Sequence, residues 1–262
     1  MLFKFIDQKI RRAFSNSAMQ YEMFAQVQKE IGRDLMNKMA QKENPSHILD
    51  VGMGTGWMTQ RLHLFYPEAR IVGIDFAFGM LQKAKEKEAQ FDLLQAQAEA
   101  LPFRHQLFDV IISNLAYQWV SDLNKAFHQN YECLKDGGLF CATLFGQKTL
   151  NELFTALEVS WEGDKKIPLP IQRLPDQSHL QEALVSSGFK SFTTDSEMIK
   201  VHFTDMFAII QWLKEIGANA LPKEVFIGRD WLHRANEYYK ENFKDEWGVS
   251  ACFEVIWIKA EK

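Results

Sequence analysis

A glycine-rich segment followed by an acidic residue is the part of the sequence best suited to bind a reactive small molecule. Residues 50–56 read Asp-Val-Gly-Met-Gly-Thr-Gly, and Asp75 ends the next apolar run. Glycines let the chain turn sharply and let a ligand approach the backbone without meeting a Cβ atom. An acid about 20 residues beyond such a turn is typical of a carboxylate that hydrogen-bonds ribose hydroxyls. The pattern indicates a nucleotide-containing cofactor, although such a turn can also merely connect a strand to a helix.

The spacing of the glycines discriminates between two cofactor classes. Dinucleotide sites usually read G-x-G-x-x-G, whereas here Gly56 stands two places after the second glycine and is followed by Trp57. A carboxylate at Asp50 would repel a pyrophosphate but suits the ammonium group of a methionine moiety. We therefore favour S-adenosylmethionine (SAM) over NAD, and keep a Rossmann dehydrogenase as an alternative. The residues expected to bind SAM here are Asp50, Gly52, Met53, Gly54, Gly56, Asp75, Phe76 and Met80.

A polar segment further along could hold the adenine ring. Residues 95–103 read Gln-Ala-Gln-Ala-Glu-Ala-Leu-Pro-Phe. An adenine needs an acceptor for its amino group and a backbone N–H for a ring nitrogen. Gln97 and Ala98 are suitably placed for these two tasks, with Glu99 beside them. Taken alone, Gln97 could equally be a solvated loop residue.

The elements that must position these segments follow from an alternation of apolar runs and helical patterns. Strands are expected at 48–51, 71–74, 91–96, 110–113 and 139–144, and helices at 18–40, 57–66, 78–89 and 123–134. This rhythm predicts an α/β fold with a doubly wound, mostly parallel, seven-stranded Rossmann-like sheet. In such sheets the ligand lies beyond the carboxyl ends of the strands.

The rhythm loosens after residue 149. Helices are expected at 151–160, 177–187, 204–216 and 229–240, a strand at 189–201, and an antiparallel closing strand at 249–259. Residues 167–170 read Ile-Pro-Leu-Pro, which excludes regular helix or central strand. We expect an amino-terminal helical lid (1–44), a SAM-binding core (45–148), and a helical cap insertion that also completes the sheet (149–262).

Composition narrows the class of protein. The 262 residues are 47% hydrophobic and 24% charged, which are globular proportions, and the formal net charge of −4 does not favour nucleic acid. No apolar run approaches the ~18 residues that a membrane span needs. Three cysteines without a CxxC or Cys/His pattern argue against a disulfide framework and against a metal site. We expect a cytoplasmic protein.

The motifs together resemble the class I SAM-dependent methyltransferases. The resemblance covers residues 50–56, 71–75, 97–103 and 108–111. Gln97 stands where that family usually has Asp, and Met53 where Cys is common. Since glutamine can still accept from an adenine amino group, we expect weakened rather than lost binding.

A narrower resemblance spans nearly the whole chain. Phe14-x-x-x-Ala18-x-x-Tyr21, with Gln28, is similar to the amino-terminal segment of the malonyl-[acyl-carrier protein] O-methyltransferases. Residues 113–119 (Ser-Asn-Leu-Ala-Tyr-Gln-Trp), 143–153 and 213–219 follow the same family's pattern. The resemblance implies that SAM methylates the free carboxylate of a malonyl thioester on acyl-carrier protein, the first step toward pimeloyl and biotin.

Few residues are then needed for chemistry, because a carboxylate is already ionised at neutral pH and requires no general base. The candidates for binding and orienting the acceptor are Tyr21, Asn114, Gln118, Trp119 and Arg173. Asn114 is also a candidate for binding SAM, and both Asn114 and Tyr21 could bond its methionine portion. Tyr21 and Gln28 share a helix face that could close over the cofactor, or could simply pack against the core. Trp119 could be a core anchor, and Arg173, the candidate partner for the malonyl carboxylate, could be a solvated surface residue.

A partner as acidic as acyl-carrier protein calls for a basic docking face. We favour the cluster of Lys4, Lys9, Arg11 and Arg12 over Lys83, Lys85 and Lys87, which alternate with glutamates and fit a solvated helix face. The sequence also allows two alternatives. One is a SAM-dependent methyltransferase for another small acceptor, such as a quinone ring or a free organic acid. The other is a repurposed SAM-binding protein, such as an arginine hydroxylase.

Overall fold

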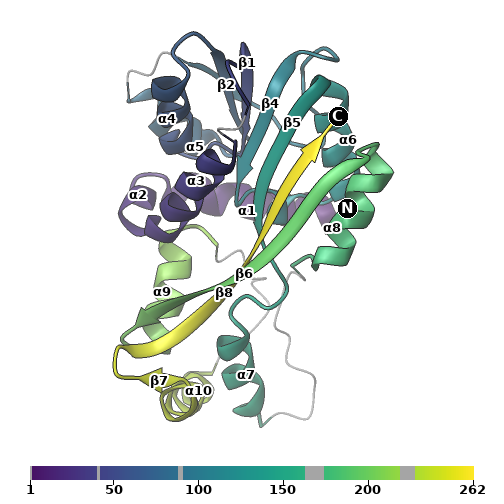
Figure 1. Cartoon of the computed structure of the whole chain (residues 1–262). Helices are drawn as coiled ribbons and strands as arrows, with labels where there is room; N and C mark the ends of the chain where they lie inside the picture. Colours follow the sequence, from purple (N-terminus) through teal and green to yellow (C-terminus); the bar gives the residue numbers. More distant parts are fainter. Residues whose placement is uncertain (1, 40–41, 88–90, 163–173, 219–227) are drawn as a thin grey trace.

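A computed structural model describes residues 2–39, 42–87, 91–162, 174–218 and 228–262. Its centre is one eight-stranded sheet with the order β3-β2-β1-β4-β5-β8-β6, and a short β7 also pairs with β8 (Figure 1). The strands are β1 (His47–Val51), β2 (Arg70–Asp75), β3 (Asp92–Gln95), β4 (Phe108–Asn114), β5 (Leu134–Phe145), β6 (Ser191–Phe203), β7 (Lys244–Asp245) and β8 (Gly248–Glu261).

The strand directions confirm the predicted sheet. Strands β1 to β5 pair in parallel, while β8 lies antiparallel between β5 and β6. The predicted closing strand, 249–259, falls within β8, which pairs along most of its length with β6. The two-residue β7 is an addition to the seven expected strands, and it continues the β8 ladder as a short hairpin.

Helices cover both faces of the sheet. One face carries α3 (Gln26–Met39), α4 (Trp57–Phe65) and α5 (Phe78–Lys85), and the other α6 (Leu123–Cys133) and α8 (Gln177–Ser187) (Figure 1). Adjacent residues of β1 explain why both faces need cover: Ile48 packs in the cluster with α3 and α4, and Leu49 in the cluster with α6 and α8. Both side chains are fully buried, which stabilises the fold by about 1.5–3 kcal/mol each.

The single helix expected at 18–40 is wrong, because the chain bends twice there. Helix α1 (Leu2–Ser17) ends before a turn, and α2 (Tyr21–Phe24) is separated from α3 by Ala25, whose ψ of 33° is not helical. The carbonyl of Phe24 accepts instead from the indole N–H of Trp212, at 2.8 Å. No glycine or proline stands at either bend, and the helical spacing of apolar residues continues across both. The sequence therefore predicted one helix. Residue 40, the last of the expected helix, lies outside the described residues.

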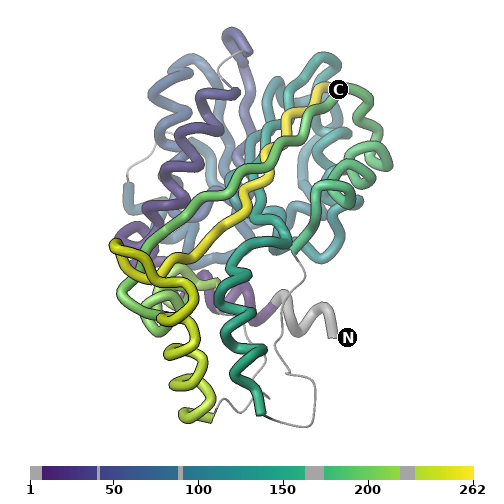
Figure 2. Tube along the Cα trace, turned by 60° about the horizontal axis from the view of Figure 1, so that its bottom comes forward, coloured from purple at the N-terminus to yellow at the C-terminus, as the bar shows by residue number. Residues whose placement is uncertain are grey.

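A second group of helices surrounds the far halves of the two longest strands. Helices α7 (Asn151–Val159), α9 (Met206–Glu215) and α10 (Arg229–Asn242) pack there around buried aromatic residues such as Trp231, Tyr239 and Phe253. Figure 2 shows α7 and α10 side by side below the sheet. The domain boundaries after residues 44 and 148 remain a prediction. Across the described ranges, no helix is both long and apolar enough to span a membrane.

Candidate active site

A cavity of about 830 Å³, counting its open mouth, lies at the carboxyl ends of β1, β2 and β4. This is where an open α/β sheet places its ligand. Most of the residues predicted from the sequence meet on its wall. They are Tyr21, Gly52, Gly54, Asp75, Phe76, Met80, Gln97, Ala98, Glu99, Asn114 and Trp119.

The glycine loop is folded back against the end of β2. Gly52, Gly54 and Gly56 all have positive φ angles, of 73°, 57° and 78°. The N–H groups of Gly52 and Met53 both donate to the carbonyl of Ile74, at 2.8 and 2.9 Å. A Cβ atom on Gly52 would stand 2.2 Å from the Cβ of Ala116. The loop therefore needs glycine for its backbone angles, and at Gly52 also for lack of space.

Asp75 holds the loop through its side chain. One carboxylate oxygen accepts from the N–H of Gly54 at 2.9 Å and the other from the N–H of Ala77 at 2.8 Å. Burial raises the pKa of Asp75 to about 6, although these backbone bonds oppose the rise. Each carboxylate oxygen has a second lone pair, so the group can still accept from a ligand hydroxyl. This arrangement suits the ribose of a nucleoside.

Asp50 is a buried carboxylate with an unsatisfied oxygen. Its Oδ2 accepts from the hydroxyl of Thr59 at 2.6 Å, but Oδ1 has no hydrogen-bond partner among the described residues. Burial raises the pKa of Asp50 to about 7; the Thr59 bond lowers it and the charge of Asp75 raises it. Asp50 is fully buried and does not itself line the cavity, but it directly precedes Val51, which does. A cation at this end of the cavity would satisfy the oxygen, and the ammonium group of SAM fits that requirement.

In the segment expected to bind adenine, Gln97 and Glu99 differ in how they are bonded. Gln97 is exposed, and its backbone carbonyl accepts from Ala100 N–H at 3.1 Å. The Glu99 side chain is bonded to the protein: its Oε1 accepts from both the N–H and the hydroxyl of Ser121, at 2.8 and 3.0 Å. Glu99 thereby fixes the loop after the short 3-10 turn η1 (Tyr117–Trp119).

Asn114 joins the sheet to helix α3. Its Nδ2 donates to the carbonyl of Gln28 at 2.9 Å, and its Oδ1 accepts from the hydroxyl of Thr143 at 2.8 Å. One amide hydrogen of Asn114 remains for a ligand. Gln28 is buried and absent from the cavity wall, which agrees with the packing interpretation of that residue.

Aromatic residues from the amino-terminal helices roof the cavity. The Phe14 ring meets the Trp119 ring edge to face at 5.3 Å and the Phe76 ring at 6.3 Å. Tyr21 is half-buried beside them, and burial together with the negative charge of Asp75 raises the pKa of its hydroxyl. The Tyr21 hydroxyl therefore stays protonated, and within the described part of the chain no hydrogen bond engages it.

Comparison with known proteins identifies the family. The family model "Methyltransferase domain" matches residues 49–142. Two curated relatives are malonyl-[acyl-carrier protein] O-methyltransferases, from Gallionella capsiferriformans and Geobacter sulfurreducens. Each is 31% identical to the chain; the matches cover 98% and 95% of this chain, and 91% and 96% of the relatives. The chain belongs to the malonyl-[acyl-carrier protein] O-methyltransferase family.

Solved structures agree on the fold of this methyltransferase. The YcgJ protein from Bacillus subtilis has a TM-score of 0.61 at 20% identity, covering 88% of this chain and 97% of its own. A Haemonchus contortus phosphoethanolamine N-methyltransferase in complex with SAM has a TM-score of 0.60 at 19% identity, covering 95% of this chain and 57% of its own.

Not every residue that the sequence singled out reaches the cavity of this methyltransferase. Met53 points into the core, where its sulfur fills the space over Gly73; a Cβ there would lie 2.3 Å from that sulfur. Gly56 is the N-cap of α4, and Gln118 is buried between two wall residues of η1. These three therefore shape the site without lining it. Arg173 lies outside the described residues.

Several wall residues were not anticipated as site residues. Phe14, Leu115, Ala116, Tyr117 and Val120 line the cavity. Leu115 has a φ of 52°, so the chain turns abruptly where β4 ends. Tyr117 is fully buried and its hydroxyl accepts from Asn130 Nδ2 at 2.5 Å, which identifies it as a rigid wall. For Leu115, Ala116 and Tyr117 the signal in the sequence was the 113–119 segment, and for Phe14 it was the amino-terminal pattern with Ala18 and Tyr21; both resemble the family.

Proposed function

We propose that this chain uses SAM to methylate the free carboxylate of malonyl-[acyl-carrier protein], giving the methyl ester. The observation that carries the proposal is the 31% identity to relatives of that name over nearly the whole chain, including the helices beyond the cofactor core. When bound, SAM supplies an electrophilic methyl group on its sulfonium.

The described wall of the cavity suits an acceptor that is already a nucleophile. Among the described residues that line it there is no histidine, cysteine or lysine, and the two acids, Asp75 and Glu99, are both held by hydrogen bonds. A carboxylate has a pKa near ~4, so it arrives ionised and needs no base. The aromatic side chains of Phe14, Tyr117 and Trp119 in the wall instead keep water away from the acceptor carboxylate.

The acceptor carboxylate must exchange its water for other partners. Tyr21 and Asn114 each keep a free N–H or O–H donor at the cavity, and we propose that they orient the acceptor or the methionine portion of the cofactor. Since the described wall has no cation, Arg173 stays our candidate for the malonyl charge. Gln118 and Trp119 complete the turn that shapes this end of the site.

Acyl-carrier protein would dock beside α1. Arg11 and Arg12 are exposed on this helix, which also carries Phe14 of the cavity roof. The alternative basic cluster, at the end of α5 and just beyond it, is partly paired, because Lys83 pairs with Glu86 and Lys87 with Glu22. The Lys87 pair is a departure from the solvated face expected from the sequence.

The docking site is tested by the double substitution Arg11→Glu with Arg12→Glu. We expect a higher KM for malonyl-[acyl-carrier protein] but an unchanged KM for malonyl-coenzyme A, since charge complementarity acts on the carrier. Lys85→Glu, an exposed residue of α5, is the matched control. Equal effects on both thioesters would argue against docking at α1.

The activity is tested with purified protein, SAM and malonyl-[acyl-carrier protein], followed by mass spectrometry of the carrier. We expect a gain of one methyl group on the malonyl carboxylate, and no comparable product with a quinone or free malonate. A biotin-requiring strain that lacks this step should grow without biotin when it expresses the chain. Methylation of another acceptor only, or SAM binding without transfer, would refute the proposal.

A further inference from the structure

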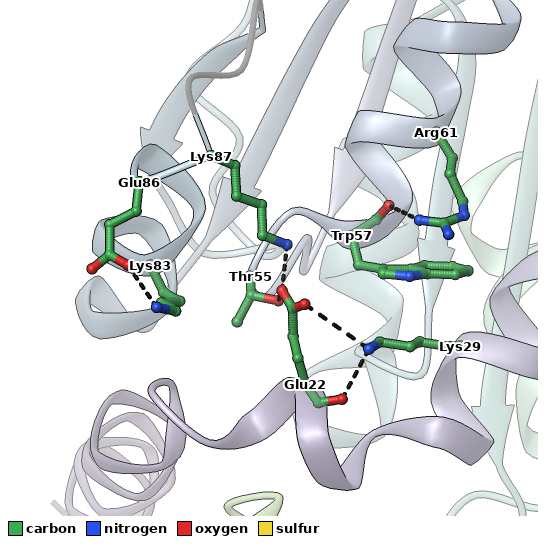
Figure 3. Close-up of polar contacts among 8 residues, drawn as sticks. All are labelled: Glu22, Lys29, Thr55, Trp57, Arg61, Lys83, Glu86 and Lys87. Carbon is green, nitrogen blue, oxygen red and sulfur yellow. Dashed lines mark hydrogen bonds and ion pairs between the residues drawn. The ribbon is translucent and has the colours of Figure 1, made fainter.

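One carboxylate ties the amino-terminal helices to the cofactor loop. Glu22 of α2 accepts a hydrogen bond from the hydroxyl of Thr55 at 2.7 Å and a second one from the ammonium of Lys87 (Figure 3). Lys29 of α3 lies 3.9 Å from the same carboxylate and donates to the backbone carbonyl of Glu22 at 2.8 Å. Four segments therefore meet at one side chain.

The partners of Glu22 lie close to both the roof and the floor of the cavity. Tyr21, the residue before Glu22, lines the cavity. Thr55 stands between Gly54, whose N–H bonds Asp75, and Gly56, which begins α4. Because Glu22 bonds the middle of this loop, it fixes the distance between Tyr21 above the cavity and the glycines below it.

Helix α2 has little apolar anchoring of its own: Tyr21 packs against Ala18, Ala77 and Met80, and polar bonds supply the rest. All four of its residues are described and none is buried, whereas α3 buries six, including Ile31 and Leu35. A helix of this length is not stable by itself. Among the described residues, the other side-chain hydrogen bond to α2, apart from those at Glu22, runs from the Trp212 indole to the Phe24 carbonyl.

The Glu22 contacts are partly shielded from water. The side chains of Glu22, Lys87 and Lys29 are 33%, 20% and 19% exposed. Burial alone would raise the pKa of Glu22, but bonds from Lys87 and Thr55 and nearby positive charge hold it below its usual value. Lys83 and Glu86 form a contrasting pair at the end of α5: they are three residues apart, and Glu86, the C-cap, is 56% exposed (Figure 3). Such a local surface pair contributes little.

We propose that Glu22 is a positioning residue that clamps α2, with Tyr21, onto the glycine loop and so slows the release of bound nucleoside. Phe14 and Tyr21 cover one side of the cavity, so a nucleoside bound beneath them must break its contacts with this roof as it leaves. Breaking the Glu22 bonds loosens α2 from the glycine loop but leaves α3 anchored through its apolar face. The inference rests on SAM as cofactor and is independent of the acceptor.

The test measures dissociation of S-adenosylhomocysteine from the full-length protein by stopped-flow displacement. Loss of a hydrogen bond to a charged, partly exposed group changes a rate or an equilibrium constant by roughly 3- to 30-fold. We therefore expect Glu22→Gln to release the nucleoside about tenfold faster. Thr55→Val should release it faster, and Thr55→Ser, which keeps the hydroxyl, should behave as wild type. Glu86→Gln is the matched control, with an unchanged rate.

A second readout separates a clamp from a general loss of structure. In the ligand-free protein, amide exchange of residues 21–25 should accelerate in Glu22→Gln while that of residues 31–36 stays unchanged. Equal dissociation rates for wild type and Glu22→Gln would overturn the proposal, as would an equal acceleration by Glu86→Gln. If Glu22→Gln fails to fold, the Thr55→Val and Thr55→Ser pair decides. Absence of nucleoside binding in the wild type would refute the cofactor as well, whereas binding without methyl transfer would count only against the proposed acceptor.

Discussion

The substitution Gly52→Ala tests the geometry of the cofactor loop most sharply. Two separate costs arise there. An alanine at a φ of 73° must adopt a left-handed conformation, which costs about 1–2 kcal/mol. Its Cβ would also stand 2.2 Å from the Cβ of Ala116, while carbon atoms prefer about 3.5–4.0 Å. Relieving such an overlap by shifting the backbone costs about 1–3 kcal/mol.

The expected loss in the free energy of unfolding is therefore about 2–5 kcal/mol, from these two costs together. A double-mutant cycle with Ala116→Gly separates them, because removing the Ala116 methyl relieves the overlap but leaves the backbone strain. We expect a favourable coupling energy of about 1–3 kcal/mol between the two substitutions.

The assay is urea unfolding of the four proteins, followed by fluorescence. Gly54→Ala is a control without the steric cost, since no atom lies within 4 Å of a Cβ there, although its φ of 57° is also left-handed. A loss below about 0.5 kcal/mol for Gly52→Ala, or zero coupling with Ala116→Gly, would contradict the described loop.

Three further predictions concern single side chains of the site. Since the Asp50 pKa is raised to about 7, SAM affinity should increase as pH rises through 7 and the carboxylate ionises; calorimetry of Asp50→Asn should show no such increase. The raised pKa also means that the stability of the ligand-free protein decreases as pH rises from about 4 to 7 in the wild type. Tyr21→Phe should leave the unfolding midpoint unchanged but lower kcat/KM by roughly 3- to 10-fold, the effect of losing one hydrogen bond. Unchanged kinetics would show that the hydroxyl has no such role. Gln97→Asp should tighten SAM binding several-fold in a titration, because a carboxylate accepts more strongly than an amide; weaker binding would contradict its place at the adenine.

The core of the fold was predictable because its signals are local. A buried parallel strand needs a short continuous apolar run, and the run at 48–51 became β1 with one residue added. Likewise, the glycines that permit positive φ angles can be recognised directly in the sequence, so the cofactor loop was predicted from it.

What the sequence did not predict depends on contacts between distant residues. Glu22 bonds residues 33 and 65 positions away, and nothing in the helical pattern around it marks those partners. Phe14 belongs to α1, which lies against α5, where the N–H of Gly79 donates to the hydroxyl of Ser15, 64 positions away. Asp109, in the fourth family motif, lies at the opposite end of β4 and accepts from the N–H of His47 and the ammonium of Lys135. Its role is to fasten the strand.

The most direct test of the account is a crystal structure of the protein with S-adenosylhomocysteine. We expect the ribose hydroxyls at Asp75, the amino group at the free oxygen of Asp50, and the adenine against Gln97 and Ala98. A nucleoside bound elsewhere, or one whose amino group is held away from Asp50 while another group satisfies that carboxylate, would contradict the central claim.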